Sequence, residues 1–167
     1  MAVTALQVES HDQAQAAAAQ AVEALNAGQL VVFPTETVYG IAALASNDQG
    51  YEALLKFKGR KQTHPFAVHL PQPAAAEQYA DLSQPVVRRL IRKLFPGPVT
   101  MVVDVPEDVI ALNLRKLGLP ASLRPRLYDE KTIGLRCPDH MVARMILRAI
   151  DGPVVASSAQ VPGKMPP

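Results

Sequence analysis

The sequence predicts an α/β (α+β) domain, in which helices cover a sheet. Short apolar or alternating runs, which are typical of strands, recur along most of the chain. Between them lie segments with apolar residues at helical spacing. Proline and glycine stand at several boundaries between the two kinds of segment. With 167 residues, the chain has the length of a single domain.

The first expected helix follows a capping signal near the N-terminus. Ser10 and Gln13 have the spacing of a capping box, in which each side chain bonds to the main chain of the other residue. An apolar stripe at helical spacing comes next: Ala14, Ala18, Ala21, Val22 and Leu25. Gly28 then suits the end of a helix. A low-complexity tail is the alternative for this alanine-rich tract, but the cap, the stripe and the glycine favour a packed helix.

The remaining elements are expected to alternate along the chain. The strands are expected at 30–33, 66–70, 99–105, 132–136 and 154–157. The helices are expected around 51–57, 86–94 and 138–150, and Pro138 suits the first turn of the last one. Residues 106–131 have the least regular pattern, and no internal repeat appears.

The composition is that of an ordinary globular protein, with 49% hydrophobic and 19% charged residues. No apolar run approaches the roughly 20 residues of a membrane helix, and the N-terminus lacks the basic and apolar regions of a secretory signal. The single cysteine, Cys137, excludes an internal disulfide and a cysteine cluster for zinc. We therefore expect a cytoplasmic protein without a membrane partner. The net charge of +2 is too small to argue for nucleic-acid binding.

Polar side chains cluster in the segment PTETVYG, residues 34–40, directly after the first expected strand. They belong to Thr35, Glu36, Thr37 and Tyr39. Burying a polar group without a partner costs roughly 1–3 kcal/mol. This segment therefore needs hydrogen-bond partners, either in the protein or in a ligand.

Two further segments carry groups that suit an anion. A basic loop consists of Lys56, Lys58, Arg60 and Lys61. An arginine fork beside a lysine ammonium suits phosphate oxygens, although a solvated helix end explains this loop better when it is taken alone. The segment SSAQ, residues 157–160, follows a strand and offers hydroxyls and an amide to a ligand. Taken alone, it is better explained as a serine-rich turn.

Arg136 ends an apolar strand, where its charge requires an anionic partner. A carboxylate of the protein and a group of a ligand are equally good partners on this evidence. Cys137 and His140 follow, which raises the alternative of a cysteine hydrolase with a Cys–His nucleophile. An inert buried cysteine fits better, because the sequence shows no second constellation of His and Asp that would support such a site.

Familiar nucleotide-binding and hydrolase motifs are missing from the sequence. It contains no GxxxxGKS or GxxxxGKT, no GxGxxG, no GxSxG and no HExxH. A nucleotide enzyme of this kind must therefore hold phosphate with side chains. A basic helix surface is also expected, formed by Arg88, Arg89, Arg92 and Lys93. It could contact nucleic acid, but a solvated face explains it better.

Five blocks occur in order along the chain: FPTETVYGIAALA, KFKGRKQTHPFAVHL, FPGPVTMVV, IGLRCPDH and PVVASSAQVPG. Through them, from about Ala21 to Gly163, the chain resembles the YrdC-like family, whose best-known members are threonylcarbamoyl-AMP synthases. The resemblance implies a twisted mixed sheet with flanking helices and a concave basic cavity. It also implies a single YrdC-like domain over residues 1–167 that lacks the usual C-terminal end.

The resemblance implies an enzyme that makes L-threonylcarbamoyl-adenylate and releases pyrophosphate. Its substrates are L-threonine, bicarbonate or CO2, and ATP, with Mg²⁺ as the expected metal. The product feeds the threonylcarbamoylation of the adenosine next to the anticodon in tRNAs that read ANN codons. The implied partners are therefore tRNA or double-stranded RNA and the downstream tRNA threonylcarbamoyl-transferase proteins.

The resemblance also implies a nucleotide site. Lys58 and Arg60 match the Lys-x-Arg element of the family, so they are expected to bind the nucleotide and stabilise the charge on its phosphates. Ser158 matches the serine of a Ser-x-Asn element, in which Gln160 stands in place of asparagine. Both residues, together with Thr100, are expected to contact the nucleotide. No side chain is identified as a metal ligand.

A neighbouring threonine site is implied in the same way. Thr35, His69 and Arg136 are expected to contact the substrate threonine. The other polar residues of 34–40 are expected to support the cavity wall.

A nucleotide- or RNA-binding paralogue that does not synthesise the adenylate is the competing interpretation. Gln160 and the missing C-terminal segment favour it.

Overall fold

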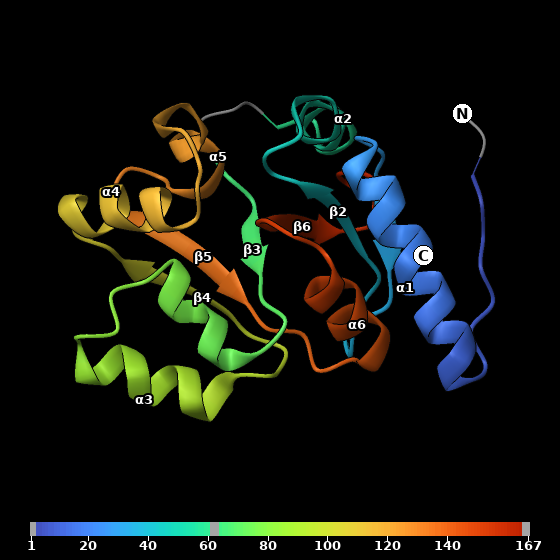
Figure 1. Ribbon diagram of the computed structural model, residues 1–167, viewed down its shortest axis with the longest axis horizontal. Helices are drawn as coiled ribbons and strands as arrows, with labels where there is room; N and C mark the ends of the chain where they lie inside the picture. The colour runs from blue at the N-terminus through green and yellow to red at the C-terminus, as the bar shows by residue number, and fades with distance from the viewer. Residues whose placement is uncertain (1–2, 61–63, 165–167) are drawn as a thin grey trace.

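The structure is a computed structural model that describes residues 3–60 and 64–164. A six-stranded sheet forms its centre (Figure 1). The strands are β1 (Val31–Phe33), β2 (Gly40–Leu44), β3 (Ala67–His69), β4 (Thr100–Asp104), β5 (Thr132–Arg136) and β6 (Val154–Ser158). Their order across the sheet is β1-β2-β6-β3-β5-β4. β3 and β5 are parallel, whereas the other neighbouring pairs are antiparallel. The expected mixed α/β fold is therefore confirmed.

Helices connect the strands and pack on the sheet. The α-helices are α1 (His11–Asn26), α2 (Asp48–Lys58), α3 (Pro85–Leu94), α4 (Glu107–Lys116), α5 (Arg124–Leu127) and α6 (Met141–Ala149). The 3-10 helices are η1 (Pro73–Gln78) and η2 (Ala121–Leu123). α1 begins as predicted, because Ser10 and Gln13 form both hydrogen bonds of a capping box. It ends before Gly28, which adopts a positive φ of 75°.

Two hydrophobic cores lie on opposite faces of the sheet. The larger core joins α2, η1, α3, α4 and α5 to one face. The smaller core joins α1 and α6 to the other face, where Ala42, Leu44, Val154 and Ala156 of β2 and β6 contact them. α1 and α6 pack side by side at one end of the molecule (Figure 1). They cover β1, β2 and β6, so the same face of β3, β5 and β4 is left open.

Residues 106–131, the least regular stretch of the sequence, contain helices for which no element was named, and the strand at 40–44 was missed. Residues 106–131 contain α4, η2 and α5, and Ile110 and Leu114 of α4 are buried in the larger core. β2 escaped detection because all five of its positions are buried. Its side chains contribute to both cores, so the strand lacks the polar alternation that marks a half-buried strand.

The other predicted elements are confirmed, with ends that differ by a few residues. Lys61, the last residue of the predicted basic loop, lies outside the described residues. Within 3–60 and 64–164, no helix combines the length and apolar character that crossing a membrane requires.

Candidate functional site

The open face of the sheet forms the floor of a cavity of about 400 Å³. Strand alternation explains the floor, because successive side chains of a strand point to opposite faces. In β5, Ile133 and Leu135 are buried in the larger core. The intervening residues of the same strand, Thr132, Gly134 and Arg136, line the cavity instead.

Most residues with an expected role line this cavity. They are Arg60, His69, Thr100, Arg136 and Ser158. The fold therefore brings together groups from the end of α2, from three neighbouring strands and from the end of β6. Their contacts with threonine and nucleotide stay predictions. Lys58, Thr35 and Gln160 are not among the lining residues. Lys58 bonds to the lining residue Ser158, whereas Thr35 and Gln160 reach lining residues through Thr37 and Lys58, respectively.

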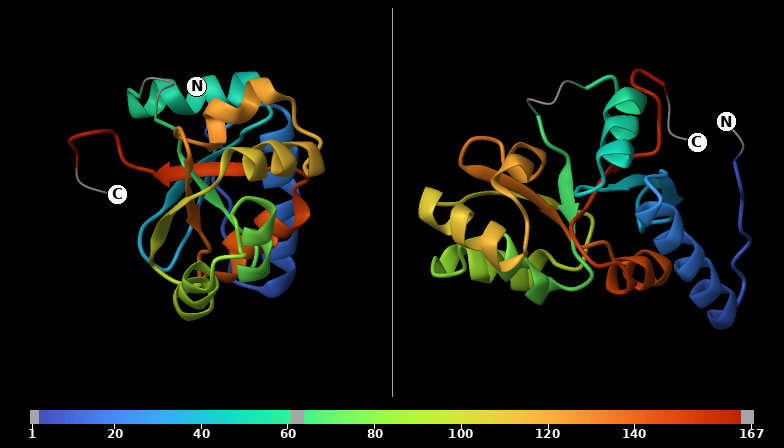
Figure 2. Two further views of the ribbon diagram at one scale, coloured as in Figure 1. Left: turned by 90° about the vertical axis from the view of Figure 1, so that its left-hand side faces the viewer. Right: turned by 45° about the horizontal axis from the view of Figure 1, so that its top comes forward.

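Lys58 lies behind the wall, at the end of α2, where it is 9% exposed. Its Nζ donates hydrogen bonds to the carbonyl oxygens of Ser158 at 3.0 Å and Gln160 at 2.8 Å. Burial and the nearby Arg60 guanidinium both lower the pKa of Lys58 from its ordinary value. The ammonium ties the end of α2 to the segment after β6, and these two parts lie side by side in Figure 2. Lys58 thus supports Ser158 directly.

Arg60 leaves the helix at its glycine cap. Gly59 has a positive φ of 58°, a conformation that glycine adopts without strain and that ends α2. Arg60 follows as an exposed residue of the cavity wall. Its guanidinium carbon Cζ lies 4.9 Å from the centre of the Phe66 ring. The guanidinium therefore lies over an aromatic face and beside the cavity.

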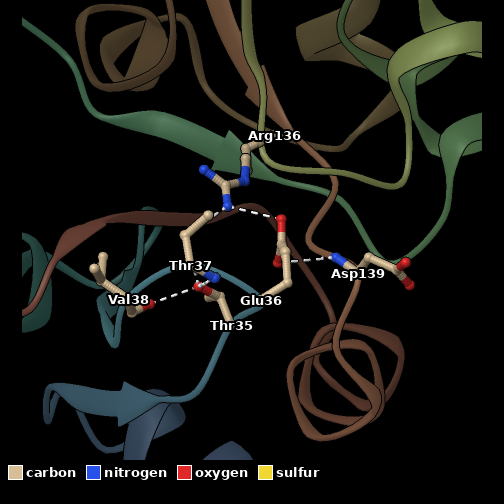
Figure 3. Close-up of polar contacts among 6 residues, drawn as sticks. All are labelled: Thr35, Glu36, Thr37, Val38, Arg136 and Asp139. Carbon is tan, nitrogen blue, oxygen red and sulfur yellow. Dashed lines mark hydrogen bonds and ion pairs between the residues drawn. The ribbon is translucent and has the colours of Figure 1, made fainter.

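Arg136 pairs with a carboxylate of the protein (Figure 3). Its Nη2 donates to Glu36 Oε1 at 2.9 Å and to Thr37 Oγ1 at 3.1 Å. The second carboxylate oxygen of Glu36 accepts a hydrogen bond from the main-chain N–H of Asp139 at 3.1 Å. The Nε of Arg136 is buried and has no partner among the described residues. One side of the guanidinium is thus fixed by the protein, and this Nε remains an unused donor.

The hydroxyl groups of residues 34–40 bond mainly to one another. Thr35 Oγ1 lies 3.1 Å from Thr37 Oγ1 and donates to the Val38 carbonyl oxygen. Tyr39 has a half-exposed side chain, and its carbonyl oxygen accepts a hydrogen bond from Ala159 N at 2.8 Å. The segment between β1 and β2 therefore reaches across to Arg136 and to the start of α6. Thr35 reaches the cavity lining through Thr37.

His69 lines the cavity as a neutral imidazole. Burial lowers its pKa to about 4. Its Nδ1 lies 3.1 Å from the Ala67 carbonyl oxygen, which can only accept, so Nδ1 carries the proton and Nε2 is an acceptor. The ring packs edge-on against Phe33, with 6.0 Å between ring centres. His69 therefore offers a fixed, neutral acceptor.

The cysteine hydrolase alternative finds no support in this structure. Cys137 is fully buried, and burial raises the pKa of its thiol to about 11, which opposes thiolate formation. The Nδ1 of His140 caps α6 by accepting a hydrogen bond from Val142 N at 3.2 Å. Cys137 is thus a buried core residue, and His140 is a helix cap.

The sequence reasoning missed several lining residues. Thr132 and Gly134 could have been found, because they alternate with buried residues in a predicted strand and precede Arg136. Val102 of β4 has the same signal, and it is 69% exposed on the cavity floor. Asp129 also lines the cavity. It lies before β5 in a stretch with no pattern, so no sequence signal identifies it.

The chemistry of the lining suits an anionic ligand with several hydrogen-bonding groups. Two guanidinium groups, those of Arg60 and Arg136, line the cavity. Hydroxyl groups accompany them, from Thr100, Thr132, Ser157 and Ser158. Arginine forks match carboxylate and phosphate oxygens, and hydroxyls can donate or accept. Among the described residues, no group of three or more His, Cys, Asp or Glu side chains could hold a metal ion.

Two known proteins with similar sequences have related names. Threonylcarbamoyl-AMP synthase of Bacillus subtilis is 32% identical over 153 residues, which cover 89% of this chain and 40% of that protein. A putative threonylcarbamoyl-AMP synthase of Mycobacterium tuberculosis is 38% identical over 148 residues, which cover 88% of this chain and 61% of that protein. The chain therefore spans between 40% and 61% of the length of these two relatives.

The fold and a family model agree with this similarity. The crystal structure of P. abyssi Sua5 complexed with L-threonine matches 96% of this chain and 42% of that chain, with a TM-score of 0.71 and 27% identity. A model of the Sua5, YciO and YrdC proteins, described as "Telomere recombination", matches residues 23–167. Because this match covers most of its residues, the chain belongs to the Sua5/YciO/YrdC family.

Proposed function

We propose that this chain makes L-threonylcarbamoyl-adenylate and pyrophosphate from L-threonine, bicarbonate or CO2, and ATP. The observation that carries the proposal is the open cavity in which Arg60, Arg136 and Ser158 come together. Two relatives named as threonylcarbamoyl-AMP synthases support it. The threonine complex of the similar P. abyssi protein supports threonine as the amino-acid substrate.

In this proposal, threonine binds near the Arg136 end of the cavity. The positive charge of Arg136 attracts the threonine carboxylate. His69 remains neutral at pH 7, so its Nε2 accepts a hydrogen bond from the threonine hydroxyl or amine. Thr35 shapes this end through its bonds within the segment 34–39.

The nucleotide binds at the other end of the cavity. Arg60 contacts the phosphates, and the Ser158 hydroxyl donates to the nucleotide. Thr100 pairs with Arg136 across β4 and β5, so its predicted contact with the nucleotide comes from the Arg136 end of the cavity. Lys58 adds positive charge behind the wall and holds the carbonyl groups of Ser158 and Gln160. Arg60 and Lys58 thus stabilise the negative charge that develops on the phosphate oxygens.

The reaction needs no nucleophile from the protein. The neutral threonine amine adds to CO2 and loses a proton, which gives a carbamate. A carbamate oxygen then attacks the α-phosphorus of ATP, and the bond from this phosphorus to the bridging oxygen breaks, so pyrophosphate leaves. Pre-oriented cations stabilise the charge of the transition state. This class of reaction is a nucleotidyl transfer.

Mg²⁺ fits this site as an ion carried by the nucleotide. Asp129 contributes a carboxylate to the lining, but the described residues offer no cluster that could cage a metal. Mg²⁺ keeps several waters and binds mainly through substrate phosphates in such sites. When bound, it neutralises phosphate charge.

The product would be consumed by a transferase that modifies tRNA. We propose tRNAs that read ANN codons as the final acceptors, the tRNA threonylcarbamoyl-transferase proteins as partners, and the cytoplasm as the location.

A nucleotide- or RNA-binding role without adenylate synthesis is the second candidate. It is favoured by Lys58, whose ammonium already bonds to two protein carbonyl groups, and by Gln160 in the Ser-x-Asn position.

One assay separates the two candidates. The purified chain is incubated with ATP and Mg²⁺, with and without threonine and bicarbonate, and pyrophosphate release is measured. A synthase releases pyrophosphate only when both threonine and bicarbonate are present. ATP binding by calorimetry without such release would overturn the synthase in favour of the binding role.

A further inference from the structure

The guanidinium of Arg60 is oriented by an aromatic ring. Its Cζ lies 4.9 Å from the ring centre of Phe66, within the range of about 6 Å over which an aromatic face attracts a cation. Phe66 is 2% exposed, so its ring is fixed by the surrounding core. Among the described residues, no hydrogen bond or ion pair holds the Arg60 side chain. Among the described residues, the contact with the Phe66 ring is therefore the interaction that orients the Arg60 side chain.

A second aromatic ring holds Phe66 in place. Tyr51 packs edge-on against it, with 6.2 Å between ring centres and 77° between ring planes. Arg126 lies over the Tyr51 ring at 4.9 Å and donates two hydrogen bonds to the protein at that end. Arg126, Tyr51, Phe66 and Arg60 therefore form a row of contacting side chains. The protein fixes the Arg126 end of this row, and the Arg60 end lies beside the cavity.

Arg126 and Arg60, at the two ends of this row, differ in what they can bind. Arg126 donates hydrogen bonds to the Ala45 carbonyl oxygen and to the Asp48 carboxylate. Arg60 lines the cavity, and its five N–H donors have no partner among the described residues. Phe66 is not a lining residue, so it reaches a ligand only through Arg60.

We propose that Phe66 is a positioning residue for the nucleotide, because its ring holds the Arg60 guanidinium beside the cavity before a phosphate group arrives. The inference rests on the proposed function, in which Arg60 binds phosphate. A pre-oriented side chain loses less conformational freedom on binding, so the ring increases affinity for ATP without touching it. Threonine binding does not use Arg60 and is unaffected.

The test compares variants by calorimetry with ATP, calorimetry with threonine, and thermal melting. Phe66→Leu removes the aromatic face and keeps an apolar side chain, and we expect ATP affinity to fall about two- to fivefold with unchanged threonine affinity. Phe66→Tyr keeps the face and should restore ATP affinity. Tyr51→Phe is the matched control, because it removes a buried hydroxyl that has no partner among the described residues and keeps the ring.

A double-mutant cycle isolates the role of Arg60 from any general loss of stability. In an Arg60→Ala background, Phe66→Leu should have no further effect on ATP affinity. It should lower the melting temperature by the same amount in both backgrounds. An equal loss of ATP affinity in both backgrounds would overturn the positioning role. So would equal losses of ATP and threonine affinity in Phe66→Leu.

The same experiments distinguish this inference from the proposed function. If Arg60→Ala weakens ATP binding and Phe66→Leu does not, the nucleotide site stands and the positioning role fails. If Arg60→Ala leaves ATP binding unchanged, the nucleotide site at Arg60 and the positioning role both fail.

Discussion

At the scale of single residues, the two arginines of the cavity are held in different ways. Arg136 is fixed by charge, through its bonds to Glu36 and Thr37. Arg60 is fixed by the face of a ring, and its donors stay available. Arg136 therefore carries a neutralising carboxylate beside it, whereas Arg60 presents its full positive charge. We therefore expect Arg60 to contribute more than Arg136 to the affinity for a multiply charged anion such as ATP.

Replacing Arg60 with alanine should weaken ATP binding by at least about tenfold. Hydrogen bonds to charged groups contribute about 1.5–3 kcal/mol, which corresponds to this factor or more. Threonine affinity should change little, and calorimetry with each substrate measures both. Arg89→Ala on α3 is the control, because it removes the same charge from an exposed residue that does not line the cavity. Equal ATP affinity in the two variants would contradict the prediction.

His69 should make the protein less stable as the pH falls. Its pKa is about 4 in the folded protein and near 6.5 in an unfolded chain. The unfolded state therefore takes up a proton first, so stability that is complete above about pH 6.5 is lost progressively toward about pH 4. The loss from this residue is at most about 3 kcal/mol.

Urea unfolding of the protein and of His69→Gln, measured across this pH range, tests the prediction. The variant should lack this part of the pH dependence. Parallel curves for the two proteins would show that His69 is not the group responsible.

At the scale of elements, alternation along the strands builds both the core and the cavity floor. The positions of β3, β4 and β5 could be predicted because each strand has an apolar face and a mixed face. β2 could not, because it is buried on both faces, and α4 was hidden within a stretch that proline and glycine interrupt.

Arg60 and Ser158 were assigned to the site only through the family resemblance, because their segments taken alone were better explained as a solvated helix end and a serine-rich turn. Arg136 stood out in the sequence itself, because its charge ends an apolar strand. The ion pair between Arg136 and Glu36 could not be predicted from the sequence. It joins residues 100 positions apart, and such a contact depends on how the whole chain folds.

Gly134 makes the floor of the cavity deep, and a large side chain there should block it. A Cβ at this position would meet the Cα and Cβ of Ala67 at 3.5 Å and Thr100 Cγ2 at 3.8 Å, which are ordinary contacts. Gly134→Leu should therefore fold and lose ATP affinity by about tenfold or more, because the side chain occupies the ligand volume. Calorimetry and thermal melting measure the two effects.

Gly134→Ala is the matched control and should bind ATP more tightly than the leucine variant. Normal ATP affinity in a folded Gly134→Leu protein would place the ligand somewhere other than this floor.

At the scale of the whole molecule, the two cores are unequal, and this inequality creates the site. The larger core covers one face of the sheet from β2 to β4, whereas α1 and α6 cover only one end of the other face. The uncovered strands expose hydroxyl groups, the guanidinium of Arg136 and a large apolar side chain, that of Val102. A ligand bound here would cover the part of this face that α1 and α6 leave open.

Ligands should therefore stabilise the protein as a whole. At a concentration about 100 times its dissociation constant, ATP adds about 2.7 kcal/mol to the stability of the folded state. For a protein of this size, the melting temperature should rise by about 5–10 °C. Thermal melting with and without ATP measures the shift, and Gly134→Leu should show about half of it or less at the same ATP concentration, because it binds at least about tenfold more weakly. An equal shift in both proteins would mean that ATP binds elsewhere.

The exposed Val102 also gives the cavity a natural place for an optical reporter. The chain contains no tryptophan, so Val102→Trp would introduce a single indole on the cavity floor. Its fluorescence would arise from this site and from no other indole. A purine that stacks on the ring would change its emission, so filling of the cavity could be followed directly in solution, in real time and without a label.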